Sequence, residues 1–159
     1  MNDRNEFVVV GLGNVLMSDE AIGVRLVEAL SARGDVDAEL IDGGTVGLQL
    51  LPRLEERRGV LFADAARLNA PSGTVRAMEG AELDAFLSGQ APTAHDVGLH
   101  DLITAMRLSG TLPDLRGLVG VQPQTIESWG GLSDALTAAL PRAVTAAAAI
   151  VTKWRNSVI

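Results

Sequence analysis

The sequence predicts an α/β protein with a mostly parallel sheet that is covered by helices on both faces. Short apolar runs alternate along the chain with longer segments of helical periodicity. Several of the short runs, such as Gly59–Asp64, are apolar at almost every position, which is typical of parallel strands buried on both faces. Alternation of such strands with helices is typical of sheets that carry helices on both sides.

Five strands are expected from β-branched or apolar runs that end at turn residues: Phe7–Val10, Ala38–Ile41, Gly59–Asp64, Gly73–Met78 and Leu118–Val121. The run at Gly73–Met78 alternates apolar with polar residues, so we expect it at an edge of the sheet. Helices are expected between the strands, at Ala21–Arg33, Leu48–Arg57, Glu79–Leu87 and Gly98–Leu108, and a last one from the cap residue Ser133 to Trp154.

Composition limits the classes of protein and of chemistry. The chain has 159 residues, of which 47% are hydrophobic, and we expect one domain over residues 1–159 with a substantial core. There is no cysteine, which excludes disulfides, thiolate metal sites and a cysteine nucleophile.

The net charge of −7 disfavours nucleic acid and anionic membranes as main partners, because both are polyanions. The N-terminal stretch MNDRNEF lacks the apolar core of a secretory signal, and the most apolar tract, Ala146–Val151, is too short to span a bilayer. We therefore expect a cytoplasmic protein with no membrane or nucleic-acid partner.

Acidic and imidazole side chains follow the expected strands. Because functional groups of parallel α/β sheets gather at the carboxyl ends of the strands, these residues should meet at one edge. They are Asp19 and Glu20 after the first strand, Asp42 after the second, Asp64 at the end of the third, and His95 with Asp96 before the fourth helix. Two carboxylates and an imidazole would make a three-ligand metal site with open coordination positions.

Each of these residues also has a simpler interpretation. The turn GLGN lacks the third glycine of a dinucleotide-binding loop, since Leu16 stands in its place. Acids at a helix N-terminus often only complement its dipole, which would account for one of Asp19 and Glu20. Asp64 closes an apolar strand and needs a partner there, whereas His100, within the fourth helix, is expected to be structural.

Five motifs occur in order along residues 6–154: GLGNVLMSDEAIG, DGGTVGLQLL, the aspartate of LFADA, HDVGLHDLI and GVQPQTIESWGGLS. Together they resemble the hydrogenase maturation proteases, endopeptidases that remove a C-terminal extension from the precursor of the large subunit of nickel–iron hydrogenases. The resemblance implies a three-layer α/β/α fold with a twisted five-stranded sheet and one antiparallel strand, which we place at Gly73–Met78.

The resemblance also implies the site residues. The family's metal-binding residues fall on Glu20, Asp64 and His95, and Asp42 is a further catalytic candidate. It implies that the precursor of the large subunit is the partner and brings the nickel, so that the protease itself has no permanent cofactor.

The residues leave open which acid is the catalytic base, and they leave two other functions open. With no HExxH pattern, no Ser-His-Asp order and no cysteine, water attack on the scissile amide is expected, but which acid is the base stays open. The alternatives are a non-catalytic maturation factor that checks metal loading, and a Rossmann-like nucleotide-binding enzyme.

Overall fold

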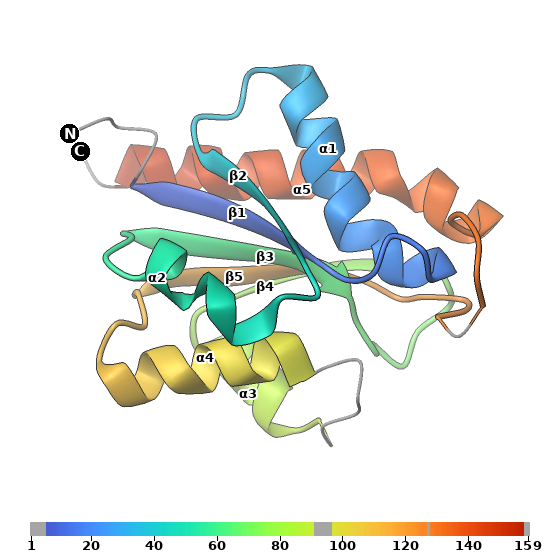
Figure 1. Cartoon of the computed structure of the whole chain (residues 1–159). Coiled ribbons are helices and arrows are strands. Elements are labelled where there is room, and N and C mark those ends of the chain that lie inside the picture. Colours follow the sequence, from blue (N-terminus) through green and yellow to red (C-terminus); the bar gives the residue numbers. More distant parts are fainter. Residues whose placement is uncertain (1–5, 91–96, 127, 158–159) are drawn as a thin grey trace.

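The computed structural model describes residues 6–90, 97–126 and 128–157, and in it five strands form one sheet in the order β2-β1-β3-β5-β4 (Figure 1). The strands are β1 (Phe7–Leu12), β2 (Glu39–Gly44), β3 (Gly59–Ala65), β4 (Val75–Glu79) and β5 (Leu115–Val121). Pairing is parallel except between β4 and β5, which run antiparallel. The predicted mostly parallel sheet with an antiparallel edge strand is confirmed.

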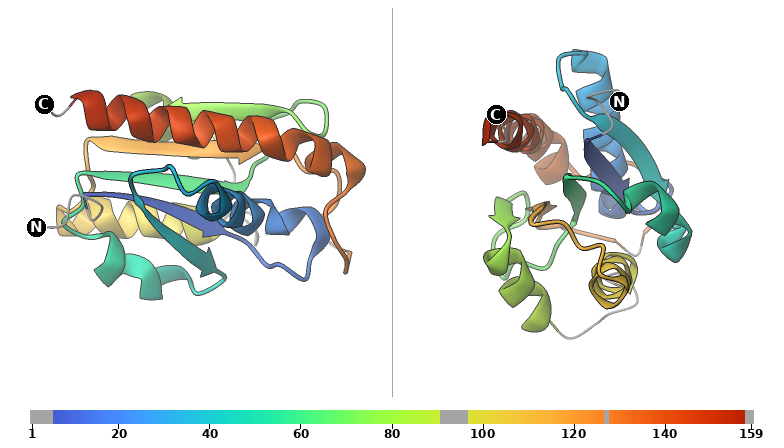
Figure 2. Two further views of the ribbon diagram at one scale, coloured as in Figure 1. Left: turned by 90° about the horizontal axis from the view of Figure 1, so that it is seen from above. Right: turned by 90° about the vertical axis from the view of Figure 1, so that its left-hand side faces the viewer.

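Helices cover both faces of this sheet (Figure 2). One layer contains α1 (Ile22–Arg33) and α5 (Asp134–Ser157), and the other contains α2 (Leu51–Leu54), α3 (Ala81–Ser88) and α4 (Val97–Ser109). Each layer closes its own hydrophobic core. Val9 and Leu61 face α1 and α5, whereas Val10 and Phe62 face the other layer. Side chains alternate between the two cores along β1 and β3, which explains why these central strands are apolar at almost every position.

The segment predicted as one helix over Leu48–Arg57 is shorter and irregular. It consists of a 3-10 turn, η3 (Gly47–Leu50), followed by the single turn α2. Pro52 has no N–H to donate and is tolerated only in the first turn, so regular helix begins no earlier than Leu51. Glu56 then adopts a φ of 64°, which ends the helix before β3.

The predicted stop of α1 and the predicted start of α5 are confirmed, whereas α5 continues to Ser157, beyond the predicted end at Trp154. Gly34 closes α1 in the left-handed conformation, at a φ of 72°. Ser133 Oγ accepts a hydrogen bond from Leu136 N at 3.4 Å at the start of α5. Among the described helices, α5 alone is long and apolar enough to cross a membrane. The core helix of a soluble protein can have the same length and apolar composition. One side of α5, including Ala143 and Ala147, is packed in the core.

A bidentate ion pair joins α3 to β5. Arg116 Nε donates to Asp84 Oδ1 at 3.0 Å and Arg116 Nη2 donates to Oδ2, and this bonding holds the pKa of Asp84 below its ordinary value of 3.8. A carboxyl whose pKa is lowered by folding stabilises the fold above its unfolded pKa, and this contribution is lost as the pH falls through the lowered value. Asp84→Asn should therefore cost about 1–2 kcal/mol at pH 7 and less near pH 3.

Urea unfolding of both proteins at the two pH values measures this difference. The matched control is Glu82→Gln, because Glu82 forms an exposed pair with Arg76 at 3.3 Å and should contribute little. A difference between Asp84→Asn and the wild type that stayed constant from pH 7 to pH 3 would contradict the prediction.

Candidate functional site

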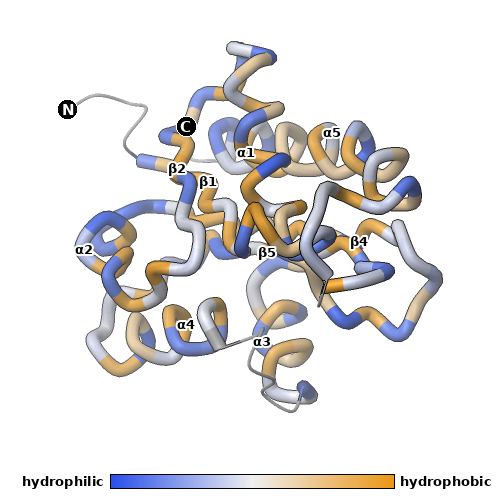
Figure 3. Tube along the Cα trace, turned by 45° about the vertical axis from the view of Figure 1, so that its right-hand side comes forward, coloured by the Kyte–Doolittle hydropathy of each residue, from blue (hydrophilic) through white to orange (hydrophobic). Residues whose placement is uncertain are grey.

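The carboxyl ends of β1, β2, β3 and β5 meet at one edge of the sheet, on the right-hand side of Figure 1. Figure 3 brings this edge forward, and both hydrophilic and hydrophobic stretches are present in its loops. The residues that follow the parallel strands are therefore gathered where the sequence predicted them.

Glycines let the first turn of α1 lie directly on the strand ends. A Cβ at Gly23 would lie 2.1 Å from the carbonyl oxygen of Ala63 and 2.5 Å from that of Leu12. A Cβ at Gly11 would lie 2.3 Å from the carbonyl oxygen of Gly23. Only residues without side chains fit at these two positions. In a dinucleotide-binding loop the second glycine lets the backbone approach the pyrophosphate. The second glycine here is Gly13, and the carbonyl oxygen of Glu20 occupies the space where its Cβ would lie.

Glu20 lies in the connection between β1 and α1, next to β3. It belongs to the 3-10 turn η2 (Ser18–Ala21), which packs against β3. Gly13 has a φ of 121°, and a Cβ there would lie 1.9 Å from the carbonyl oxygen of Glu20 and 3.4 Å from its Cγ. Gly13 N also donates to Gly44 O at 2.9 Å, which ties this turn to the end of β2. The backbone position of Glu20 is thus determined by close packing.

Asp64 lies near the end of β3 and is only 8% exposed. It points to the same side of the sheet as Phe62, the side that α4 covers. Since Gly23 of α1 packs against Ala63, the segment that carries Glu20 and the strand end that carries Asp64 are adjacent. The backbone segments that carry these two predicted residues are therefore neighbours at this end of the sheet.

His95 and Asp96, which precede α4, lie outside the described residues. Within residues 6–90, 97–126 and 128–157, no three acidic or histidine side chains are grouped closely enough to hold a metal ion. The predicted three-ligand set therefore depends on His95. The other histidine, His100, has the structural role expected, because its Nε2 lies 2.9 Å from Leu87 O.

Asp42 lies apart from Asp64. It is exposed on β2 and pairs in register with Gly11. Its neighbour Ile41 faces the α4 side, so Asp42 points to the opposite side from Asp64. Its role as a catalytic candidate stays a prediction.

Asp19 has a role that reasoning from the sequence missed. Its carboxylate is fully buried and accepts hydrogen bonds from Gln124 N, Thr125 N, Ser133 N and Ser133 Oγ at 2.7–3.1 Å. We call this arrangement the Asp19 clamp. It fastens the loop between β5 and α5 to the turn that carries Glu20. No local signal in the sequence connects Asp19 with Ser133, 114 positions away.

Ser18 reinforces the Asp19 clamp. Its backbone N donates to Gly130 O at 3.0 Å and its Oγ donates to Gly131 O at 3.0 Å. Ser18 makes these bonds at a φ of 48°, in the left-handed region. This conformation is energetically unfavourable for a residue other than glycine and is retained where surrounding contacts enforce it.

Asp19→Asn is expected to destabilise the fold by about 2–3 kcal/mol. An amide keeps the size of the carboxylate but offers one accepting oxygen, so its NH2 group would face a buried donor. Urea unfolding measures the loss, and Asp134→Asn is the control, because Asp134 is exposed in the first turn of α5. Equal stability of the two variants would contradict the proposed role of the Asp19 clamp.

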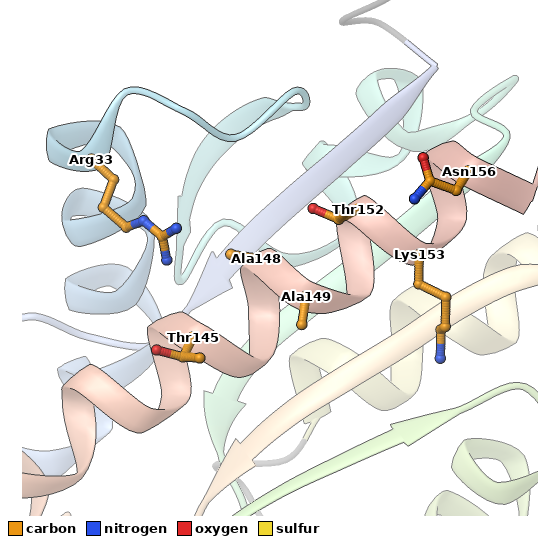
Figure 4. A pocket seen from close by; sticks show the side chains of 7 residues that line it. All are labelled: Arg33, Thr145, Ala148, Ala149, Thr152, Lys153 and Asn156. Atoms are coloured by element: carbon orange, nitrogen blue, oxygen red, sulfur yellow. The ribbon is translucent and has the colours of Figure 1, made fainter.

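A surface hollow elsewhere lacks the groups needed for catalysis. It lies between Arg33 of α1 and the outer side of α5, and Figure 4 shows Thr145, Ala148 and Thr152 beneath Arg33. The remaining lining residues are Ala149, Lys153 and Asn156. None of these seven lining residues is acidic or a histidine. The candidate site is therefore the edge of the sheet where the carboxyl ends of the parallel strands meet, which we call the carboxyl edge.

The chain is similar to known proteins of one family. Residues 24–150 match the family model described as hydrogenase maturation protease. The chain is 38% identical over 141 residues to the hydrogenase 2 maturation protease of Escherichia coli (strain K12), covering 86% of this chain and 85% of that protein. It is 34% identical over 150 residues to the hydrogenase expression/formation protein HoxM of Cupriavidus necator, covering 92% and 74%.

Among solved structures, the hydrogenase maturating endopeptidase HybD from E. coli superposes with a TM-score of 0.81 at 35% identity, and 93% of each chain is covered. The family model spans most of the chain, and these relatives share its fold as well as its sequence. The chain therefore belongs to the hydrogenase maturation protease family, and the peptidase class predicted from its motifs is confirmed.

Proposed function

We propose that this protein is the endopeptidase that removes the C-terminal extension from the nickel-loaded precursor of a nickel–iron hydrogenase large subunit. The observation that supports the proposal is the packing of the turn that carries Glu20 against β3, the strand whose end carries Asp64. The names of the relatives, maturation protease and maturating endopeptidase, support the reaction class. We also place the reaction in the cytoplasm.

In this proposal nickel is part of the substrate. Glu20 and Asp64 offer carboxylate oxygens and His95 offers an imidazole nitrogen, a donor set that suits a divalent ion of borderline character such as nickel. Glu20 and Asp64 sit on backbone that close glycine contacts hold in place, so they are oriented before the precursor arrives. The metal locates the scissile bond beside them.

The chain itself supplies acid–base groups and no covalent nucleophile. Asp19 is excluded as a base, because all of its bonding is directed to the loop and Ser133. Glu20 or Asp64 accepts a proton from the attacking water. The water oxygen bonds to the scissile carbonyl carbon, the C–N bond breaks, and the departing amine takes up the proton. Holding water and amide together turns a bimolecular attack into a nearly unimolecular one.

The nickel content of the precursor is expected to decide whether cleavage occurs. Three reactions are compared on a gel: loaded precursor, empty precursor, and empty precursor with protease that has been soaked in nickel. Only the loaded precursor should shift to the shorter form, because nickel bound to the protease alone does not hold the precursor in register. Efficient cutting of the empty precursor would contradict substrate recognition through nickel.

The same assay separates the alternatives. A metal-checking factor without activity would bind the loaded precursor and release no peptide. A nucleotide-binding enzyme would bind a dinucleotide, and the missing third glycine, with Leu16 in its place, argues against that function.

A further inference from the structure

The carboxyl edge carries most of the exposed apolar surface. Among the described residues six large hydrophobic side chains are exposed, and five of them lie in loops at this edge: Val15, Leu16, Val46, Leu48 and Trp129. We call these five residues the apolar rim. The sixth, Leu108, lies near the end of α4, close to the start of β5 and thus at the opposite edge.

Trp129 is the most unusual member of the apolar rim. The chain has only five aromatic residues, three phenylalanines and two tryptophans. Phe7, Phe62 and Trp154 are buried in the cores and Phe86 is half-buried, whereas Trp129 is 76% exposed. An exposed tryptophan in a chain that otherwise shelters its aromatic rings indicates a contact surface, because tryptophan is enriched among the residues that dominate binding energy.

Hydrogen bonds join the loops of the apolar rim into one surface. Gly130 N donates to Leu16 O at 3.2 Å and Ser18 N donates to Gly130 O at 3.0 Å, so the loop of Trp129 runs beside that of Leu16. On the other side, the bond from Gly13 N to Gly44 O joins the bases of the loops that carry Val15 and Val46. The Asp19 clamp fixes the loop of Trp129, which reduces the cost of ordering it on binding.

We propose that the apolar rim is the docking surface for an uncharged, apolar segment of the precursor next to its scissile bond. This inference rests on the proposed function. Residues 14–17, 45–49 and 128–131 contain no charged side chain, although 21% of the chain is charged, so the surface selects an apolar partner and not a charged one. The rim is also continuous with the predicted site, since Leu16 and Glu20 lie in the same connection between β1 and α1.

Two variants of the apolar rim test the proposal, Trp129→Ala and Leu16→Ser, with Leu108→Ser as the matched control. The rim binds the precursor and does not touch the reacting atoms. Each rim variant should therefore raise KM for nickel-loaded precursor about tenfold and leave kcat nearly unchanged. Leu108→Ser should behave as the wild type, although the leucine it removes is 84% exposed, more than the 57% of Leu16. Thermal unfolding should be unchanged in all three, which shows that the variants fold.

Binding is measured in parallel by calorimetry with the same precursor, so that the inference is tested apart from cleavage. A wild type that binds the precursor without cutting it would overturn the proposed function, and weaker binding by Trp129→Ala would still support the docking surface. Rim variants whose KM and affinity stay within twofold of the wild type would overturn the docking surface alone. A wild type that sediments as a dimer at micromolar concentration, while Trp129→Ala is a monomer, would assign the rim to a second copy of the chain and also overturn it.

Discussion

Replacing Glu20 by glutamine, or Asp64 by asparagine, is expected to lower kcat/KM for the nickel-loaded precursor by about a hundredfold or more. Both changes keep the size of the side chain and remove its charge, so they weaken the contact to a divalent ion without opening a cavity. Neither change disturbs the contact of Gly13 with the backbone of Glu20 or that of Gly23 with Ala63, the residue before Asp64. His95→Ala should cause a similar loss, which the family resemblance implies.

Cleavage kinetics should be accompanied by calorimetry with nickel or cadmium, which reports metal affinity separately from turnover. The controls are Glu28→Gln, which removes an exposed acid paired with Arg25, and Asp114→Asn, which removes an exposed acid before β5. Both controls should cleave as the wild type does. Unchanged metal affinity and activity in all three site variants would show that the site has been assigned to the wrong residues.

Gly13→Val is expected to lower the free energy of unfolding by about 3 kcal/mol or more, and to abolish cleavage in any protein that still folds. Gly13 has a φ of 121°, which valine does not adopt without strain. Its Cβ would lie 1.9 Å from the carbonyl oxygen of Glu20, so either the turn or Glu20 must move. The substitution is therefore expected to displace Glu20, a residue of the predicted site.

Urea unfolding of Gly13→Val is compared with that of Gly98→Val in α4, where a Cβ meets nothing within 4 Å. The control should lose little stability. If Gly13→Val were as stable as the wild type, the close approach to Glu20 would not constrain the turn. If the wild type bound a dinucleotide tightly and Gly13→Val did not, the glycines would serve a nucleotide site after all.

Periodicity predicted most of the elements correctly because it reports which faces are buried. The strand at Gly59–Asp64 was recognised since both of its faces lie against helices, and Gly73–Met78 was assigned to an edge since only one face of β4 is well covered. The helix predicted at Leu48–Arg57 was wrong, because Pro52 and the left-handed Glu56 limit it to η3 and one turn of α2.

By itself the sequence determined the alternation of strands and helices, the edge of the sheet at which polar groups collect, and the family to which its motifs belong. The first two follow from short-range patterns, namely side-chain period and the residues that end each element, whereas the family follows from the resemblance of the five motifs. The tertiary structure alone decided that Asp19 is a clamp, since its hydrogen-bond partners lie more than 100 positions away. It alone decided that Gly11, Gly13 and Gly23 serve the close approach of α1 to the strands, because backbone contacts between distant segments leave no periodic trace in a sequence.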